Sequence, residues 1–196
     1  MRIVNLDQHG PHWLKWRALG IGGSDVPAIL NESPFTCADE LYEVKMGRRV
    51  VKENHRMRRG KRLEPEARVK YIEVTGIQTR PVCVVHSEHE WLRASLDGLS
   101  MDNKIVLEIK CPSDHTHETA LRGVVPGYYY SQCQHQLLVT GCQTLHYWSY
   151  TDSKKFPEEE RIALVKVVPN PEHQERIFKQ SKAFWERLQA EQKQAE

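Results

Sequence analysis

Three charged residues near the middle of the chain have the types and the spacing of a hydrolytic site. Glu108 and Lys110 stand one residue apart in VLEIKCP, and Asp97 precedes them in ASLDGLS. In a β-strand, alternate side chains point to the same face, so Glu108 and Lys110 would share one face and the apolar residues beside them would pack on the other. If Asp97 ends the preceding strand, the two carboxylates would meet across a hairpin.

Two carboxylates on neighbouring strands offer hard oxygen ligands of the kind that Mg²⁺ and Mn²⁺ prefer. A lysine beside such an ion can orient water or help to deprotonate it, which is the remaining requirement for hydrolysis of a phosphodiester. The alternative interpretation of Glu108 and Lys110 is an ion pair on an exposed sheet face. The two residues alone favour that alternative, so the hydrolytic interpretation depends on what accompanies them.

Sequence patterns predict the elements that must position these residues. We expect helices over 8–18, 36–46, 60–76, 126–141 and 170–193, and a short helix capped by Ser24 or Asp25. We expect strands over 81–87, 90–98, 103–110, 143–151 and 160–168. Pro65 is tolerable only in a first turn, which would place Glu64 near the start of its helix. This order predicts an α/β fold with a central mixed β-sheet flanked by helices.

Composition limits the class of protein. The 196 residues, of which 39% are hydrophobic and 28% charged, suit a single domain over 1–196. No apolar run is long enough to cross a membrane and the first residues lack a secretory core, so we expect a cytoplasmic protein. The five cysteines form no CxxC pair, which argues against a disulfide framework, a zinc site or an iron–sulfur cluster. His115 and His117 are interpreted as part of a polar loop.

Positive charge is concentrated in one stretch, although the net charge is only +2. Residues 45–62 contain nine basic residues and one acidic residue, Glu53. A local positive field is what binding to a polyanion such as DNA requires. The alternative is a basic face that is neutralised in the folded protein by acidic residues distant in sequence.

The order of the charged residues resembles a known superfamily. Glu64, Asp97, the Glu-x-Lys of 108–110 and Gln132 follow the pattern of the PD-(D/E)XK nucleases, which implies a restriction-endonuclease-like core. Five blocks make the resemblance more specific: RALGIGGSD (17–25), RGKRLEPEA (59–67), ASLDGL (94–99), LEIKCP (107–112) and YYSQCQ (129–134). Together they resemble the phage lambda exonuclease, or YqaJ-type viral recombinase, family over roughly residues 13–140.

The resemblance implies a role for each matched residue. Asp97, Glu108 and the backbone carbonyl of Ile109 would hold two Mg²⁺ ions per site, with Mn²⁺ as a possible substitute, and Glu64 would support the second ion. Lys110 would position the attacking water. The remaining assignments are Gln132 and Tyr129 lining the site, Arg17 and Ser24 binding a 5′-phosphate, and Arg48, Arg49, Arg58 and Arg59 of the basic stretch contacting DNA.

The activity that the family implies is a Mg²⁺-dependent deoxyribonuclease. It would degrade one strand of linear duplex DNA from a 5′-phosphorylated end, release mononucleotides, and leave 3′ overhangs for recombination by strand annealing. A homotrimeric ring, a single-strand annealing protein as partner and a phage or prophage gene in a bacterial host follow by analogy. The segment after LEIKCP lacks a basic residue found in some relatives, and Arg122 is a candidate substitute.

Two other functions fit parts of the sequence. An endonuclease would use the same chemistry, but a pocket for a terminal phosphate is useful only to an enzyme that starts at an end. A non-catalytic DNA-binding module would need only the basic stretch. Two carboxylates that face a phosphodiester would weaken such binding unless a metal intervened.

Overall fold

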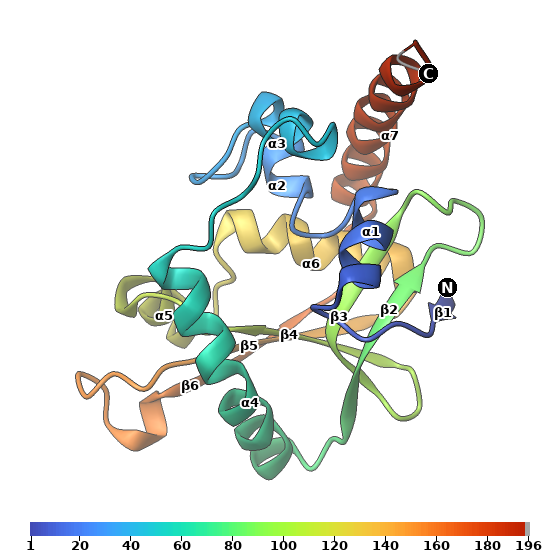
Figure 1. The fold of residues 1–196 in the computed structure, drawn as a ribbon. Coiled ribbons are helices and arrows are strands. Elements are labelled where there is room, and N and C mark those ends of the chain that lie inside the picture. The colour runs from blue at the N-terminus through green and yellow to red at the C-terminus, as the bar shows by residue number, and fades with distance from the viewer. Residues whose placement is uncertain (195–196) are drawn as a thin grey trace.

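The computed structural model describes residues 1–194, and its centre is one six-stranded sheet (Figure 1). The strands are β1 (Arg2–Val4), β2 (Thr79–Val85), β3 (Arg93–Ser100), β4 (Ile105–Lys110), β5 (Thr144–Tyr150) and β6 (Ile162–Val167). They lie side by side in sequence order. The pair β4 and β5 is parallel and all other neighbours are antiparallel, so the expected mixed sheet is confirmed.

Seven α-helices and one short 3-10 helix complete the described fold. They are α1 (Pro11–Ala18), α2 (Val26–Ile29), α3 (Ala38–Lys45), α4 (His55–Thr75), α5 (Asp114–Leu121), α6 (Gly127–Thr140), η1 (Glu158–Glu160) and α7 (Pro171–Gln194). The helices α5 and α6 form the crossover that a parallel pair of strands requires, and they connect β4 to β5.

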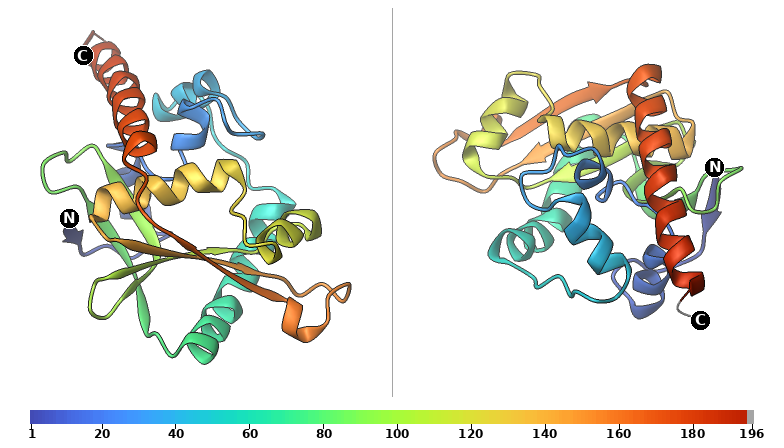
Figure 2. Two further views of the ribbon diagram at one scale, coloured as in Figure 1. Left: turned by 180° about the vertical axis from the view of Figure 1, so that it is seen from behind. Right: turned by 90° about the horizontal axis from the view of Figure 1, so that it is seen from above.

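Helices cover both faces of the sheet (Figures 1 and 2). On one face, Leu137 and Cys133 of α6 pack with Val106 of β4 and with other buried residues of the sheet. On the opposite face, α4 packs through Leu63, Ala67 and Tyr71 against Leu107, Ile109 and Trp148. The alternation of side chains along β4 therefore places Leu107 and Ile109 under α4, as the period of two predicts, and leaves Glu108 facing α6.

Helix α4 differs from its predicted form. It begins at His55 rather than near residue 60, and Pro65 lies in its interior instead of its first turn, so Glu64 is not near the helix start. Asn54 caps the helix by accepting a hydrogen bond from the N–H of Met57. A proline removes the bond to the carbonyl four residues earlier, here that of Lys61, which lies on the exposed side where water can replace the missing donor.

Three shorter segments also depart from prediction. Residues 114–121 form α5 instead of a polar loop, and His117 is fully buried, bonded to Ser149 and to the carbonyl of Glu160. Asp25 is the N-cap residue of α2, but neither it nor Ser24 caps the helix through its side chain. The strand β1 was not predicted, because three residues carry too little of a pattern.

No helix in residues 1–194 has both the length and the apolar character that a membrane span requires.

Candidate active site

The site lies where β3 and β4 part. These strands pair at Gly98 with Leu107 and at Leu99 with Val106. Beyond that point the carboxylate of Asp97 takes the place of a strand partner and accepts a hydrogen bond of 2.7 Å from the N–H of Ile109. The hairpin thus brings Asp97 to the two charged residues of β4, as the sequence predicted.

Glu108 is buried, and both of its carboxylate oxygens accept hydrogen bonds. One of its oxygens accepts a hydrogen bond of 2.6 Å from Gln132 and also pairs with the ammonium of Lys110, and the other accepts a bond of 2.5 Å from Gln136. Its side chain is 1% exposed, which excludes an ion pair on an open sheet face. Two glutamines one helical turn apart on α6 therefore fix the carboxylate in place.

Lys110 is the positive charge of the site. Burial favours the neutral amine, but the carboxylates of Glu108 and Asp97 dominate and raise the pKa of Lys110. Its ammonium also lies 5.2 Å from the ring centroid of Tyr129, within the range of a cation–π interaction. Lys110 is therefore held as a cation between Glu108 and an aromatic ring.

The carboxyl of Asp97 lies in surroundings that disfavour its negative charge. Burial, followed by the nearby charge of Glu108, raises its pKa well above the usual value, and Glu64 adds a smaller effect in the same direction. A divalent cation between Asp97 and Glu108 would remove this unfavourable interaction, and their oxygens suit a hard ion. The residues present thus fit the metal that the sequence predicts.

Glu64 stands apart from the pair. Its carboxylate accepts a hydrogen bond of 2.7 Å from Arg68, whose other nitrogen donates to the backbone carbonyl of Asp97. Within residues 1–194, no three His, Cys, Asp or Glu side chains lie close enough to enclose a metal ion by themselves. The structure brings Asp97 and Glu108 together and leaves Glu64 beside them on α4.

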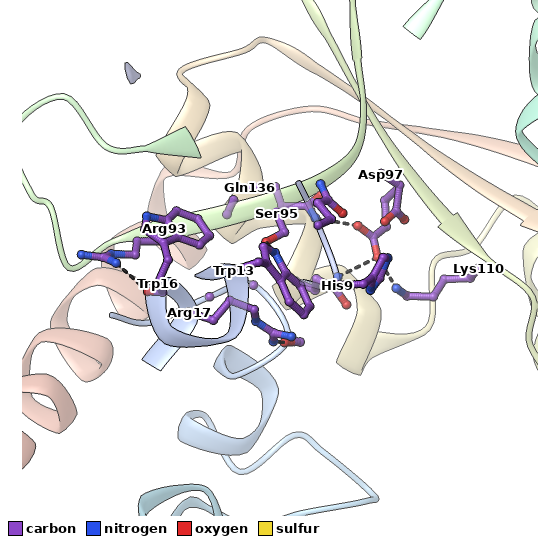
Figure 3. A pocket seen from close by; sticks show the side chains of 16 residues that line it. His9, Trp13, Trp16, Arg17, Arg93, Ser95, Asp97, Lys110 and Gln136 are labelled. Carbon is purple, nitrogen blue, oxygen red and sulfur yellow. Dashed lines mark hydrogen bonds and ion pairs between the residues drawn. The ribbon is translucent and has the colours of Figure 1, made fainter. Parts of the chain in front are cut away.

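A cavity of about 190 Å³ connects this pair to the N-terminal segment (Figure 3). Asp97, Glu108, Lys110, Gln132 and Gln136 line one part of it, and Trp13, Arg17, Ser24 and Arg93 line the other. The guanidinium of Arg17 donates to the hydroxyl of Ser24 at 2.7 Å and lies 4.7 Å from the ring centre of Trp13. The two residues expected to bind phosphate are thus in contact and share a cavity with the carboxylates.

Gly20 attaches the N-terminal segment to the sheet. The N–H of Ile21 donates to the carbonyl of Trp91, and the N–H of Arg93 donates to the carbonyl of Ile21. A Cβ atom at position 20 would lie only 2.4 Å from the oxygen of Trp91. Only glycine permits this close approach, which places Arg17 and Ser24 beside β3.

The buried ion pair of Asp25 with Lys45 was not anticipated. The two groups are 2.6 Å apart, and Lys45 also donates to the carbonyls of Gly20 and Arg17. Burial acts to raise the pKa of Asp25, but the charges of Lys45 and Arg17 hold it below its usual value. Lys45 therefore supports the segment that carries Arg17 and cannot contact DNA.

Gln136 is the main residue of the site that the sequence interpretation missed. It follows Gln132 by four residues, so the two share one face of α6. That spacing could have indicated a second amide at the site. Trp13 and His9, which also line the cavity, gave no comparable signal.

Six of the nine basic residues of the stretch pair with acidic side chains, some near and some distant in sequence. Arg48 pairs with Glu191 and Glu43, and Arg49 pairs with Glu40. Arg59 donates to the carbonyls of Cys111 and Pro112 and pairs with Asp152. Arg58 differs, because it pairs with no acidic side chain of residues 1–194 and lines a second cavity with His55, Arg59 and Arg62.

The fold and the site define the class of protein, a nuclease-like α/β core with a carboxylate pair and a lysine at a strand end. Residues 12–143 match the YqaJ-like viral recombinase domain, and the chain belongs to that family. The uncharacterized protein YqaJ of Bacillus subtilis strain 168 is 28% identical over 141 residues, which are 70% of this chain and 44% of that protein.

Solved structures share the fold over nearly the whole chain. An alkaline exonuclease from Laribacter hongkongensis, LHK-Exo, is 28% identical and superposes with a TM-score of 0.80, covering 93% of this chain and 94% of that one. Its complex with dAMP gives a TM-score of 0.79 at the same identity and coverage. A phage-related exonuclease from Haemophilus somnus, 16% identical with a TM-score of 0.69, covers 89% of this chain and 96% of its own and supports the fold alone.

Proposed function

We propose that this protein is a deoxyribonuclease that degrades one strand of linear duplex DNA from a 5′-phosphorylated end, using Mg²⁺. The observation that carries the proposal is the shared cavity, in which Arg17 and Ser24 stand opposite the carboxylate pair and Lys110. An exonuclease needs both parts at once, because it must hold a strand end and hydrolyse the neighbouring phosphodiester. The similarity to LHK-Exo, a solved alkaline exonuclease, supports an exonuclease activity.

Asp97 and Glu108 would hold the divalent ions, with the carbonyl of Ile109 as a further ligand. Glu64 would support the second ion through the carboxylate oxygen that does not accept the hydrogen bond from Arg68. When bound, the ions activate water and stabilise the leaving 3′-oxygen. Mn²⁺ is also a hard cation and is the expected substitute.

The other side chains position the substrate. Lys110 would orient the attacking water from its place between Glu108 and Tyr129, and Gln132 would keep the Glu108 carboxylate in one orientation. Arg17 offers a planar fork that can make two hydrogen bonds to a terminal phosphate, and the hydroxyl of Ser24 can add a third. The expected products are mononucleotides and a 3′ overhang.

The assembly is proposed from the family. A ring of three subunits would enclose the duplex and give processivity without tight binding, and a single-strand annealing protein would take up the 3′ overhang. Of the four arginines expected to contact DNA, Arg58 is the one without an acidic partner among the described residues, since Arg48, Arg49 and Arg59 are engaged by acidic partners.

The first experiment uses a linear duplex with a 5′-phosphate at one end and a 5′-hydroxyl at the other, with a closed circle as control. In Mg²⁺ we expect mononucleotides from the phosphorylated 5′ end and an intact circle, and no products in EDTA. Cutting of the circle would instead establish an endonuclease. Binding without products under all metal conditions would leave only a DNA-binding module.

A further inference from the structure

An aromatic track leads away from the catalytic lysine to the surface. We define it as the rings of Tyr129, Tyr128 and Phe35. Tyr129 lies under the ammonium of Lys110, Tyr128 is 4.3 Å from Tyr129 between ring centroids, and Phe35 meets Tyr128 edge to face at 5.5 Å. The track therefore starts at the candidate active site and ends at a ring outside it.

The outer end of the track carries an exposed aromatic ring and a positive charge. Phe35 is 59% exposed in the loop between α2 and α3. The guanidinium of Arg56, at the start of α4, lies 5.7 Å from the ring centre of Phe35. Arg56 forms no ion pair with the acidic side chains of residues 1–194, so its charge is available to a ligand. An exposed ring beside a cation is a combination that a nucleic acid strand can use, since a base can stack on the ring and a phosphate can pair with the cation.

We propose that the aromatic track binds the unpaired bases of the strand being degraded, on the 3′ side of the cleaved bond, and that Arg56 contacts a phosphate of that strand. This inference rests on the proposed nuclease function and names the substrate form that the site takes. Aromatic rings interleaved with basic side chains are the usual means of holding single strands without sequence preference, because every base has a stacking face.

The position of the cavity indicates where the strand would run beyond the cleaved bond. The 5′-terminal nucleotide would lie between Arg17 and the carboxylates, in a cavity whose lining includes Lys110 but none of the three rings of the track. The side chain of Glu108 is only 1% exposed, so we expect the strand to separate from its complement in order to bring its phosphodiester to the carboxylates beside Lys110. Tyr129 and then Tyr128 and Phe35 are the next surfaces beyond Lys110.

The test uses 2-aminopurine, an adenine analogue whose fluorescence falls when it stacks on an aromatic ring. It is placed at the third nucleotide of a 5′-phosphorylated single strand or, as a control, at the tenth. Binding is followed in Ca²⁺ under conditions in which no products form. We expect stronger quenching at the third nucleotide than at the tenth.

Variants of the track identify the ring responsible. Phe35→Ala should remove the position-specific quenching and weaken single-strand binding about five- to tenfold, as expected for loss of one stacking partner. Phe35→Trp should restore both. Met101→Ala, in the turn between β3 and β4, is the matched control because Met101 is 60% exposed and should change neither.

Two results would overturn the inference: equal quenching at both positions in the wild-type protein, or unchanged quenching in Phe35→Ala. Quenching by intact duplex but not by single strand would likewise contradict it. Product release in Mg²⁺ is measured in parallel. If mononucleotides form while Phe35→Ala behaves as the wild type, only the aromatic track fails. If the quenching is found and no mononucleotides form, the nuclease proposal fails and the single-strand site stands.

Discussion

At the scale of single residues, the charges of the site are only partly paired. Lys110 forms an ion pair with one oxygen of Glu108, and Gln132 and Gln136 donate hydrogen bonds to its carboxylate. The carboxylate of Asp97 accepts one backbone hydrogen bond and forms no salt bridge within residues 1–194. We therefore expect Asp97 and Glu108 to bind an added metal cation, whereas Lys110 should act on the attacking water and on the phosphate of the substrate.

This difference predicts distinct losses on substitution. Asp97→Ala should lose both metal binding and cleavage, because it removes an oxygen ligand. Lys110→Ala should lower the rate of nucleotide release by about 100-fold or more while metal and DNA binding remain, because positioned catalytic groups commonly contribute that much. Rates are followed by nucleotide release and metal binding by calorimetry, with Lys104→Ala, an exposed lysine before β4, as control. Wild-type rates in either variant would refute the assignment.

Arg17 should determine the preference for phosphorylated ends. Arg17→Ala removes the fork, and Arg17→Lys keeps the charge but cannot make two parallel hydrogen bonds. We expect the rate ratio between 5′-phosphate and 5′-hydroxyl ends to fall about tenfold or more in Arg17→Ala and to be only partly restored in Arg17→Lys. The exposed Lys15→Ala on the same helix is the control. An unchanged ratio in Arg17→Ala would exclude Arg17 from the phosphate pocket.

At the scale of elements, α1 is held to β3 by the hydrogen bond of Trp13 to Ser95, by that of Arg93 to the carbonyl of Trp16, and by the close approach of Gly20 to Trp91. The methyl group of Gly20→Ala would overlap a backbone oxygen of the turn before β3, which already accepts the hydrogen bond of Ile21 and cannot easily move. Such overpacking costs typically about 1–3 kcal/mol. We expect a lower free energy of unfolding in urea and, in the protein that remains folded, a weaker preference for 5′-phosphate.

The matched control for Gly20→Ala is Gly60→Ala on α4. A Cβ atom at Gly60 meets nothing within 4 Å, and alanine is favoured over glycine within a helix. The free energy of unfolding should therefore stay equal or rise in Gly60→Ala. If Gly20→Ala were as stable as the wild type, the close approach would not be what holds α1.

The sequence predicted correctly the features that neighbouring residues determine, and it did not predict those that depend on residues distant in the chain. The period of two along 106–110 was enough to place Glu108 and Lys110 on one face of β4 and Leu107 on the other. The start of α4 was wrong because Pro65 is tolerated in this interior on its exposed side, which no local rule shows. The ion pairs of the basic stretch with Glu191 and Asp152 could not be predicted, because these partners stand 90 or more residues away.

At the scale of the whole molecule, α6 connects the site to both β3 and α7. His135 of α6 illustrates this, because it is fully buried and its Nε2–H donates to the carbonyl of Arg93 at 2.8 Å. Its Nδ1 is buried without a hydrogen-bond partner in the described structure. Burial, opposed in part by the bond to Arg93, lowers the pKa of His135 to about 4.

This burial predicts how stability depends on pH. The unfolded chain, in which a histidine has a pKa of about 6.5, binds the proton more readily than the folded one. The contribution of His135 is therefore complete above pH 6.5 and is lost as the pH falls toward 4, by up to about 3 kcal/mol. The free energy of unfolding of His135→Gln should decline less over this range than that of the wild type. His12→Gln, an exposed histidine, should follow the wild type, and parallel curves for all three proteins would contradict the prediction.

The bridge between Ile21 and Leu92 has a consequence for the order of folding. Asp97 and Glu108 belong to one hairpin and meet by closing a short loop, whereas Arg17 reaches them only after a loop of about 70 residues closes, which is entropically more costly. The hydrolytic centre should therefore assemble before the end-binding part. If Arg17 and Ser24 bind the strand end as proposed, a partly unfolded molecule that has released its first 25 residues would retain the Asp97–Glu108 pair but lose its selectivity for strand ends. We would then expect a stable α1 to protect DNA that has no free end.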